Sequence, residues 1–595
     1  MADEHSEPAE PDGGVITEDD DVYTTAEVGK QYRDTVYRER DYDSLESAPA
    51  TSSYPEEGTK DGYKLSEMPK VPKVSHIVGP SAIMLGASLG SGETMFWPKL
   101  LAQYGWTLYW AFWIGVITQF FINTELQRWT MATGESIFRG YDRISRVWPW
   151  FFLVAGLFHL GWPGWASGGA KVFADWTGIV ATGDWWMIAV VSMVLIWLSY
   201  QAGPVLYNII ENAQVALMFV AVGAAVVLAM VVGSAGQLVN VPAGAVNFGA
   251  LPPADELDIA TFLGGLAYAG AGGYINLSQG VWAREKGYGM GTYQGRLKNP
   301  LRGAEPEGIQ GGFAFEPTEK NLKRWRGWWS VTQREHFLTF VVGLLVVATI
   351  AMTISIEYAE GYTGGAIDMW LSVIIPQLGG LSATLLYAVI FIALFSTQYA
   401  IVESFVRNSV DILYQVYGRA RGIDESQLFL GTLSLFTLWG IVIIALSNAV
   451  ALISQPWILL VIGAAIAGVM MWPYNALTII LNTTRLPEHT QPGWARVVAM
   501  WWATGFFGFF SVLLIGGQLA GPVAEAAASY GLGSLAVFFE SFTVDIAVVG
   551  SGAGGYVLWV LALVVQVYTM YRSARAKLDA SGTVEGAEDA SGLLA

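Results

Sequence analysis

One acidic residue lies deep inside an apolar segment, beside a run of glycines. Residues 86–93 read GASLGSGE, and Glu93 is the only acidic residue in the apolar stretch 75–103. A charged side chain at bilayer depth costs roughly 2.5–3.5 kcal/mol on insertion scales, so it marks a candidate functional site. Glu93 could ligate a cation, accept a coupling proton, or form an ion pair with Lys99, about two helical turns on.

A second glycine cluster follows in the middle of the chain, where residues 269–276 read AGAGGYIN. Glycine is poor in helix interiors, and a break at bilayer depth leaves backbone groups that water cannot reach. Interrupted helices at matching positions in two halves of a chain point to a secondary transporter's binding site. We therefore expect both clusters to form one site. Its expected residues are Gly90, Ser91, Gly92 and Glu93 with Gly272, Gly273, Tyr274 and Asn276.

Glu93 and Asn276 are the side chains of this site that could hold a metal ion. The backbone of 90–92 would add carbonyl oxygens for a cation, or amide groups for an anion at the N-terminus of the following half-helix. The alternative role for the glycines is close packing between helices.

Other polar residues within apolar segments are candidates for coupling. His159 could relay protons or be a satisfied interior histidine. Ser396, Thr397 and Gln398 could complete an ion site, or the two hydroxyls could bond back to the preceding turn. We expect Glu211, and Glu403 with Arg407, to form ion pairs or gates on the cytoplasmic side.

Several classes of site are excluded or disfavoured. The chain has no cysteine, which excludes disulfides and thiolate metal sites, and its five histidines show no metal-ligand spacing. Residues 86–90 match G-x-S-x-G, which leaves a membrane hydrolase using Ser88 and His159 as an alternative, but the motif needs a strand-to-helix turn that is not expected here. We expect a protein that is not an enzyme, binds no cofactor and has no nucleic-acid partner.

These residues must be positioned by membrane-spanning helices. The chain has 595 residues, 53% of them hydrophobic, and a helical span needs roughly 20 apolar residues. About twelve segments qualify. They are 75–103, 106–125, 148–172, 185–202, 208–233, 259–283, 336–356, 371–398, 427–447, 455–481, 497–519 and 555–571.

The basic residues sort to one side of these segments. With both termini inside, the expected outer loops 234–258, 357–370, 448–454 and 520–554 contain no Lys or Arg. Positively charged residues favour the cytoplasmic side of a membrane. We expect a multi-pass plasma-membrane protein with cytoplasmic termini.

The segments divide into two sets of five followed by two more. An odd number per set inverts the second set, so we expect inverted repeats at 75–234 and 259–483 and extra helices at 497–572, within a membrane domain spanning 75–572. The cytoplasmic loop 284–335 contains KRWRGWW at 323–329, which could be a helix on the lipid surface or a moving gate.

Two tails flank the membrane domain. Residues 1–73 contain 19 acidic and 8 basic residues and few large aliphatic ones, so we expect 1–74 to be a disordered, solvated cytoplasmic tail. Residues 573–595 form a second cytoplasmic tail. The net charge of −18 also suits a salt-adapted protein.

The first two segments resemble the natural-resistance-associated macrophage protein (Nramp) family of divalent-metal transporters. The resemblance lies in Gly79-Pro80, the glycine cluster ending at Glu93, Tyr104-Gly105, Trp110 and Thr133-Gly134, with matching intervals up to Trp110. It extends loosely over 75–520. The resemblance implies a LeuT-like fold, alternating access, and coupling to a metal ion or a proton.

The aligned metal-site residues differ from those of the family. The family's metal-binding Asp aligns with Gly90, its Pro with Ser91 and its Asn with Glu93, while its Met-Pro-His motif aligns with 273–275. The soft thioether ligand is therefore missing, and the remaining oxygen donors suit a hard cation such as Mg²⁺. The sequence predicts an all-α transporter in the lipid bilayer, carrying a divalent cation or, alternatively, a small organic solute such as an amino acid; it leaves the oligomeric state open.

Overall fold

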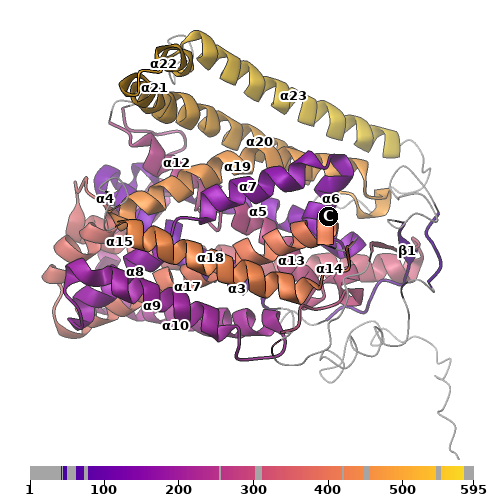
Figure 1. The fold of residues 1–595 in the computed structure, drawn as a ribbon, viewed down its shortest axis with the longest axis horizontal. Coiled ribbons are helices and arrows are strands. Elements are labelled where there is room, and N and C mark those ends of the chain that lie inside the picture. Colours follow the sequence, from indigo (N-terminus) through magenta and orange to yellow (C-terminus); the bar gives the residue numbers. More distant parts are fainter. Residues whose placement is uncertain are drawn as a thin grey trace, which may run out of the picture.

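The computed structural model describes residues 42, 45–49, 62–72, 78–232, 234–253, 256–299, 301, 311–418, 421–447, 450, 454–544 and 551–581. The described chain is almost entirely helical (Figure 1), apart from a short parallel pair of strands, β1 (Lys64–Leu65) and β2 (Phe313–Ala314). Eight of its helices are long and apolar enough to cross a membrane. The chain is an all-α multi-pass membrane protein, as predicted.

The helices follow the predicted order. The first set contains α3 (Pro80–Ser88), η3 (Leu89–Phe96), α4 (Trp97–Tyr104), α5 (Tyr109–Thr133), α6 (Ile137–Ile144), α7 (Val147–Leu160), α8 (Gly164–Thr177), α9 (Trp185–Ser199) and α10 (Leu206–Val231). The second contains α11 (Val241–Val246), α12 (Ile259–Ala267), α13 (Gly273–Lys286), α14 (Glu319–His336), η9 (Phe337–Val341), α15 (Val342–Ala359), α16 (Ala366–Asp368), α17 (Gly380–Leu413), α18 (Glu425–Ser447) and α19 (Pro456–Thr484). The last contains α20 (Trp494–Leu514), η16 (Ile515–Leu519), α21 (Ala520–Ser529), α22 (Gly533–Glu540) and α23 (Ala553–Ser581).

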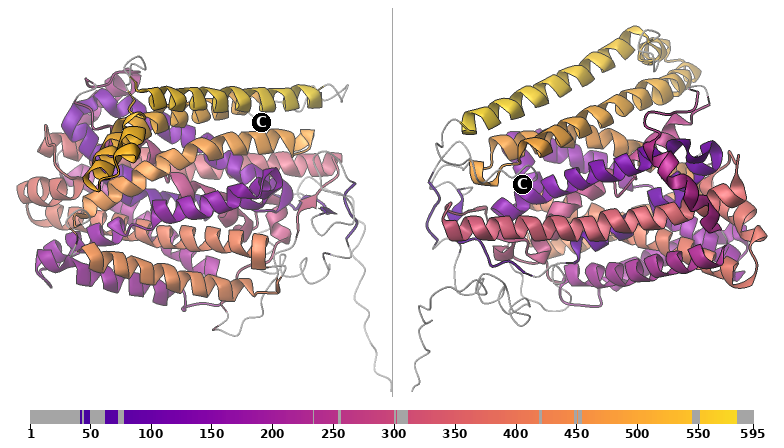
Figure 2. Two further views of the ribbon diagram at one scale, coloured as in Figure 1. Left: turned by 45° about the horizontal axis from the view of Figure 1, so that its top comes forward. Right: turned by 180° about the vertical axis from the view of Figure 1, so that it is seen from behind.

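The first spans of the two sets lie against each other in the middle of the molecule. The first span consists of α3, η3 and α4, and the sixth consists of α12 and α13. Because α12 packs on η3 while α13 packs on α3, the two spans run in opposite directions. The long helix α17 contacts both of them, whereas α20 and α23 form an outer layer on α19 (Figures 1 and 2). Helix α3 begins, and helices α13 and α17 end, at the same end of the molecule. We call this end the basic end.

The eighth span differs from the predicted segment 371–398. It begins at Gly380, where φ is +52°, and continues to Leu413, while the residues from Ala366 to Gln377 form separate short helices. Hydropathy ends the segment too early, because Glu403, Arg407 and Asp411 are charged and yet buried in the helix. These charges pair inside the protein, so they do not mark the end of the helix.

Part of the predicted solvated tail is packed against the basic end. Within 1–74, residues 62–72 form a segment that we call the strap. Its Tyr63 hydroxyl donates to Glu135 (3.0 Å), and its Met68 amide donates to the Asn321 side chain (3.0 Å). The expectation of disorder does not hold for the strap; most of the rest of 1–74, and residues 582–595 of the second tail, lie outside the described residues.

The predicted helix over 323–329 exists as part of α14, but its tryptophans do not face lipid. Trp325, Trp328 and Trp329 are buried, and the Trp328 indole donates to the Pro69 carbonyl of the strap (2.9 Å). The guanidinium of Arg128 lies 3.8 Å from the centre of the Trp329 ring. The strap and α5 therefore cover the face that the sequence assigns to acyl chains.

Candidate functional site

The glycine cluster of the first span stays helical, in contrast to the expected break. Residues Leu89–Phe96 form wider π-helical turns, in which the Trp97 amide donates to the Gly92 carbonyl. A π-helical segment keeps the backbone hydrogen-bonded where water is absent, and such segments are frequent at functional sites. The carbonyls of 90–92 are therefore less available to a cation than the sequence suggests.

Close contacts explain the glycines of this segment. A Cβ atom on Gly92 would lie 1.5 Å from the Tyr268 carbonyl oxygen, and one on Gly90 would lie 2.4 Å from the Ala393 carbonyl oxygen. The first atom belongs to the sixth span and the second to α17. Because these residues have no side chain, the main chains of three spans are in direct contact here.

The sixth span is broken, as the sequence predicts. Helix α12 ends at Ala267 and α13 begins at Gly273, and φ is positive at Gly270 (131°), Gly272 (47°) and Gly273 (59°). L-residues rarely adopt such angles, so glycine is required at these positions. The break frees backbone groups at the centre of the molecule.

Glu93 faces this break. Its side chain is fully buried, the backbone of Gly270 lies beside the carboxylate, and no side chain among the described residues donates a hydrogen bond to either carboxylate oxygen. Lys99, the alternative ion-pair partner, instead donates to Gln103 (2.8 Å) and lies 4.0 Å from Asp258. The protein supplies no counter-charge to Glu93 within the part that the structure describes.

His159 on α7 touches both sides of the break. Its Nδ1 accepts from the Tyr274 amide (3.1 Å), and its Nε2 lies 2.7 Å from the Tyr268 hydroxyl. The first bond requires a bare Nδ1, so the proton of a neutral ring is on Nε2 and is donated to Tyr268. In this arrangement His159 links the end of α12 to the start of α13.

Two amides that the sequence analysis did not select also line the break. Asn276 donates through Nδ2 to Asn123 Oδ1 (2.7 Å) and to Gln119 Oε1 (3.2 Å), which leaves its own Oδ1 without a partner. Gln119 and Asn123 are four residues apart on α5, so they share one face of the helix. Two amides four residues apart in an apolar segment are the sequence feature that could have identified these residues.

The remaining predicted residues hold spans together around the site. Ser396 and Thr397 donate to the Gly86 carbonyl (2.9 and 3.1 Å), and Thr397 also accepts from the Gly90 amide (2.9 Å). Gln398 accepts from the Ala166 amide (3.1 Å). These contacts fix α17 against the first span and α8.

Ser91 and Tyr274 have different surroundings. The Trp165 indole donates to the Ser91 hydroxyl (2.9 Å), so Ser91 lies beside the Trp165 ring. The Tyr274 ring packs near Phe138 and Phe405, toward the basic end. The structure thus brings Ser91, Gly92 and Glu93 to the break and points the Tyr274 ring away from it.

No group of three or more His, Asp or Glu residues in the described chain is arranged to hold a metal ion. In the described part of the chain, the carboxylate oxygens of Glu93 and the Oδ1 of Asn276 are among the atoms near the break without a hydrogen-bond partner. Such a set offers few direct protein ligands, and a small hard cation would keep part of its hydration shell.

Charged residues close the basic end. Arg284 of α13 pairs with Asp411 of α17 (2.7 Å), and Arg407 of α17 pairs with Glu403 and with Glu285 of α13 (3.2 Å). A further pair joins Lys286 to Glu211 of α10. The expected ion pairs therefore form, and they tie the end of α13 to its neighbours. At the other end Lys171 pairs with Asp368 (2.7 Å).

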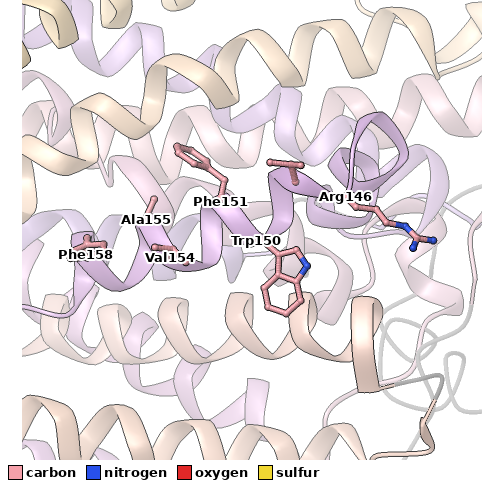
Figure 3. A pocket seen from close by; sticks show the side chains of 7 residues that line it. Arg146, Trp150, Phe151, Val154, Ala155 and Phe158 are labelled. Carbon is pink, nitrogen blue, oxygen red and sulfur yellow. The ribbon is translucent and has the colours of Figure 1, made fainter.

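A groove of about 720 Å³ runs along the outer face of α7 (Figure 3). Its lining residues are Arg146, Val147, Trp150, Phe151, Val154, Ala155 and Phe158. All but Arg146 are apolar, so the groove offers no path for an ion. Its large apolar side chains are exposed, as expected of a surface that meets lipid.

Solved structures share this fold. The chain is similar to a histidine-to-alanine variant of the Eremococcus coleocola manganese transporter, with a TM-score of 0.61 and 10% identity over 90% of this chain and 99% of that one. The same transporter in complex with an aromatic bis-isothiourea compound gives a TM-score of 0.60, with 11% identity over 89% and 100% of the two chains. No protein-family model matches the chain, and no curated protein sequence matches it either. The chain therefore has the LeuT fold.

Proposed function

We propose that this chain is a secondary-active transporter, a divergent relative of Nramp proteins, that moves a cation by alternating access. Glu93 and the break of the sixth span would form the binding site. The observation that carries the proposal is the buried Glu93 carboxylate, which faces the break and has no side-chain hydrogen-bond partner or ion-pair partner among the described residues. An ionised carboxylate in such surroundings is strongly unfavourable unless a cation or a proton neutralises it.

The donor chemistry favours a hard divalent cation such as Mg²⁺. Glu93 and Asn276 offer oxygen atoms, and both nitrogens of His159 are engaged with Tyr268 and Tyr274. No thiolate is available, because the chain has no cysteine. Oxygen ligands bind Mg²⁺ well, whereas sulfur and imidazole ligands favour softer metals.

Uptake into proteoliposomes tests this function. The purified chain should accumulate Mg²⁺ in preference to Mn²⁺, and Glu93→Gln should lower the rate at least about tenfold, because the neutral amide cannot balance the cation. Ser88→Ala is the matched control: Ser88 lies in the same span, and its hydroxyl only bonds back to Met84 (2.9 Å). Unchanged uptake in Glu93→Gln would refute the role of Glu93, and loss of activity in Ser88→Ala would revive the enzyme alternative.

A small organic solute, such as an amino acid, is the second candidate. Aromatic rings gather beside the break: the Trp165 and Tyr268 rings are 5.8 Å apart, and those of Phe96 and Tyr268 are 6.0 Å apart. Such rings bind apolar groups and organic cations. Uptake of radiolabelled amino acids without uptake of Mg²⁺ or Mn²⁺ would favour this candidate.

We further propose that the transporter lies in the plasma membrane with both termini in the cytoplasm, so that the basic end faces inward. The absence of basic residues from the expected outer loops supports this orientation. Protease protection of the strap in sealed vesicles of known orientation would test it.

A further inference from the structure

The break in the sixth span leaves main-chain groups that a continuous helix would satisfy. The side chain of Gln119 on α5 takes over part of this role. Its Nε2 donates to the Ala267 carbonyl at the end of α12 (2.6 Å), and its Oε1 accepts from the Gly272 amide at the start of α13 (3.3 Å). One amide therefore bridges the two half-helices.

This bridge is tightly enclosed. Gln119 is fully buried, and a Cβ atom on Gly270 would lie 2.5 Å from its Oε1. The Asn276 side chain donates to the same oxygen (3.2 Å), so the first turn of α13 is held at two points. His159 makes a second bridge, from α7.

Movement of α13 relative to α12 must break the Gln119 bridge. Helix α13 carries Arg284, Glu285 and Lys286, the residues that close the basic end, whereas α12 packs on η3 beside Glu93. In alternating access one group of helices moves against another around a fixed site, so we expect α13 to move while α12 stays with the site.

We propose that Gln119 is a positioning residue of the transport cycle, which holds the two halves of the sixth span in the closed arrangement and releases α13 when the basic end opens. This inference rests on the proposed transport function. Removing the amide should shift the population toward open forms, even without substrate, because the bridge stabilises only the closed form.

Cysteine labelling measures this shift without substrate. The chain has no cysteine, so Ser278→Cys places a single thiol on α13, at a fully buried position whose hydroxyl has no hydrogen-bond partner. Adding Gln119→Met should raise the rate of maleimide labelling about fivefold, as expected when one net hydrogen bond is lost. Gln127→Met is the matched control, because Gln127 is a buried amide of the same helix whose side-chain atoms make no hydrogen bond.

Transport kinetics give the second measurement. The apparent KM depends on the fraction of molecules in the closed form, which stays the major form, so Gln119→Met should raise the KM for Mg²⁺ uptake far less than it raises the labelling rate, while Gln127→Met leaves both unchanged. If Gln119→Met does not fold, Gln119→Glu and Gln127→Glu supply the same comparison. Equal labelling rates in the Gln119 and Gln127 variants would overturn the proposal. Faster labelling in a protein that transports none of the tested substrates would support the bridge and refute the transport function.

Discussion

At the scale of single residues, the site depends on glycines that admit close contacts. Gly92 is the sharpest case, because a methyl group there would collide with the Tyr268 carbonyl oxygen at 1.5 Å. We expect Gly92→Ala to lower the free energy of unfolding by about 1–3 kcal/mol or more, as overpacking does, and to abolish uptake. Thermal unfolding in detergent and proteoliposome uptake measure the two effects.

Gly223→Ala is the control for this prediction. Gly223 lies within α10, and a Cβ atom there would have no neighbour within 4 Å. Alanine is a better helix former than glycine by roughly 0.5–1 kcal/mol, so this variant should be as stable as the original chain or more so. Equal behaviour of the two variants would show that the contact at Gly92 is not required.

Sequence analysis located part of this site but not its connections. Glu93 and the 270–273 glycines stand out because a charge and a helix breaker are rare inside apolar segments. Gln119 and Asn123 were missed because neutral amides in a membrane helix carry little signal until their partners are known. The partners of Gln119 lie about 150 residues away in the sequence, and only the fold brings them together.

At the scale of elements, the glycine clusters correctly predict where the chain departs from a regular α-helix. They do not predict whether the departure is a π-helical segment or a complete break. Both glycine clusters predicted a break, yet the first span forms π-helical turns and the sixth separates into α12 and α13. The difference lies in the neighbours: His159 and Gln119 satisfy the groups freed in the sixth span. The C-terminal end of α17 was mispredicted for a related reason, because charged residues that pair inside the protein resemble a polar loop in the sequence.

The connection between α5 and the outer helices gives a prediction at this scale. The buried Glu125 of α5 pairs with Arg128 (2.9 Å) and with Arg496 of α20 (3.0 Å), and accepts from Asn482 of α19 (3.0 Å). Glu125→Gln would leave two arginines without their anion, which should lower the free energy of unfolding by about 3–5 kcal/mol.

Glu93→Gln is the internal control for this experiment. It makes the same chemical change at another fully buried carboxylate, but one without a partner, so it should leave thermal stability unchanged or raise it. Thermal unfolding of both variants in the same detergent provides the comparison. Equal losses of stability would mean that Glu93 has a structural counter-charge, and the proposed binding role would fail.

At the scale of the whole molecule, the N-terminal region divides into an acidic part and the strap. Residues 1–41 contain 13 acidic and 4 basic residues, whereas the strap places Tyr63 and Met68 in buried positions at the basic end. Tyr42 and Ala48 are also buried and bond to the strap: the Tyr42 hydroxyl donates to the Gly62 carbonyl (3.1 Å), and the Ala48 amide donates to the Tyr63 carbonyl (2.8 Å). Composition could not separate the two, because the strap is too short and too polar to be recognised without its partners on α14 and β2.

Two truncations should therefore behave differently. Removing residues 1–41 leaves Tyr42 and the strap in place and changes the net charge from −18 to −9, so the unfolding temperature should be kept and should depend less on salt, which screens repulsion between exposed charges. Removing residues 1–72 also deletes the strap, and each buried Tyr or Met side chain that is lost removes roughly 1.5–3 kcal/mol of apolar burial. Thermal unfolding of both forms at low and high salt checks the prediction. If the shorter truncation alone lowers the unfolding temperature at every salt concentration, residues 1–41 contribute packing contacts rather than charge. If the longer truncation has no further effect, the strap does not stabilise the basic end.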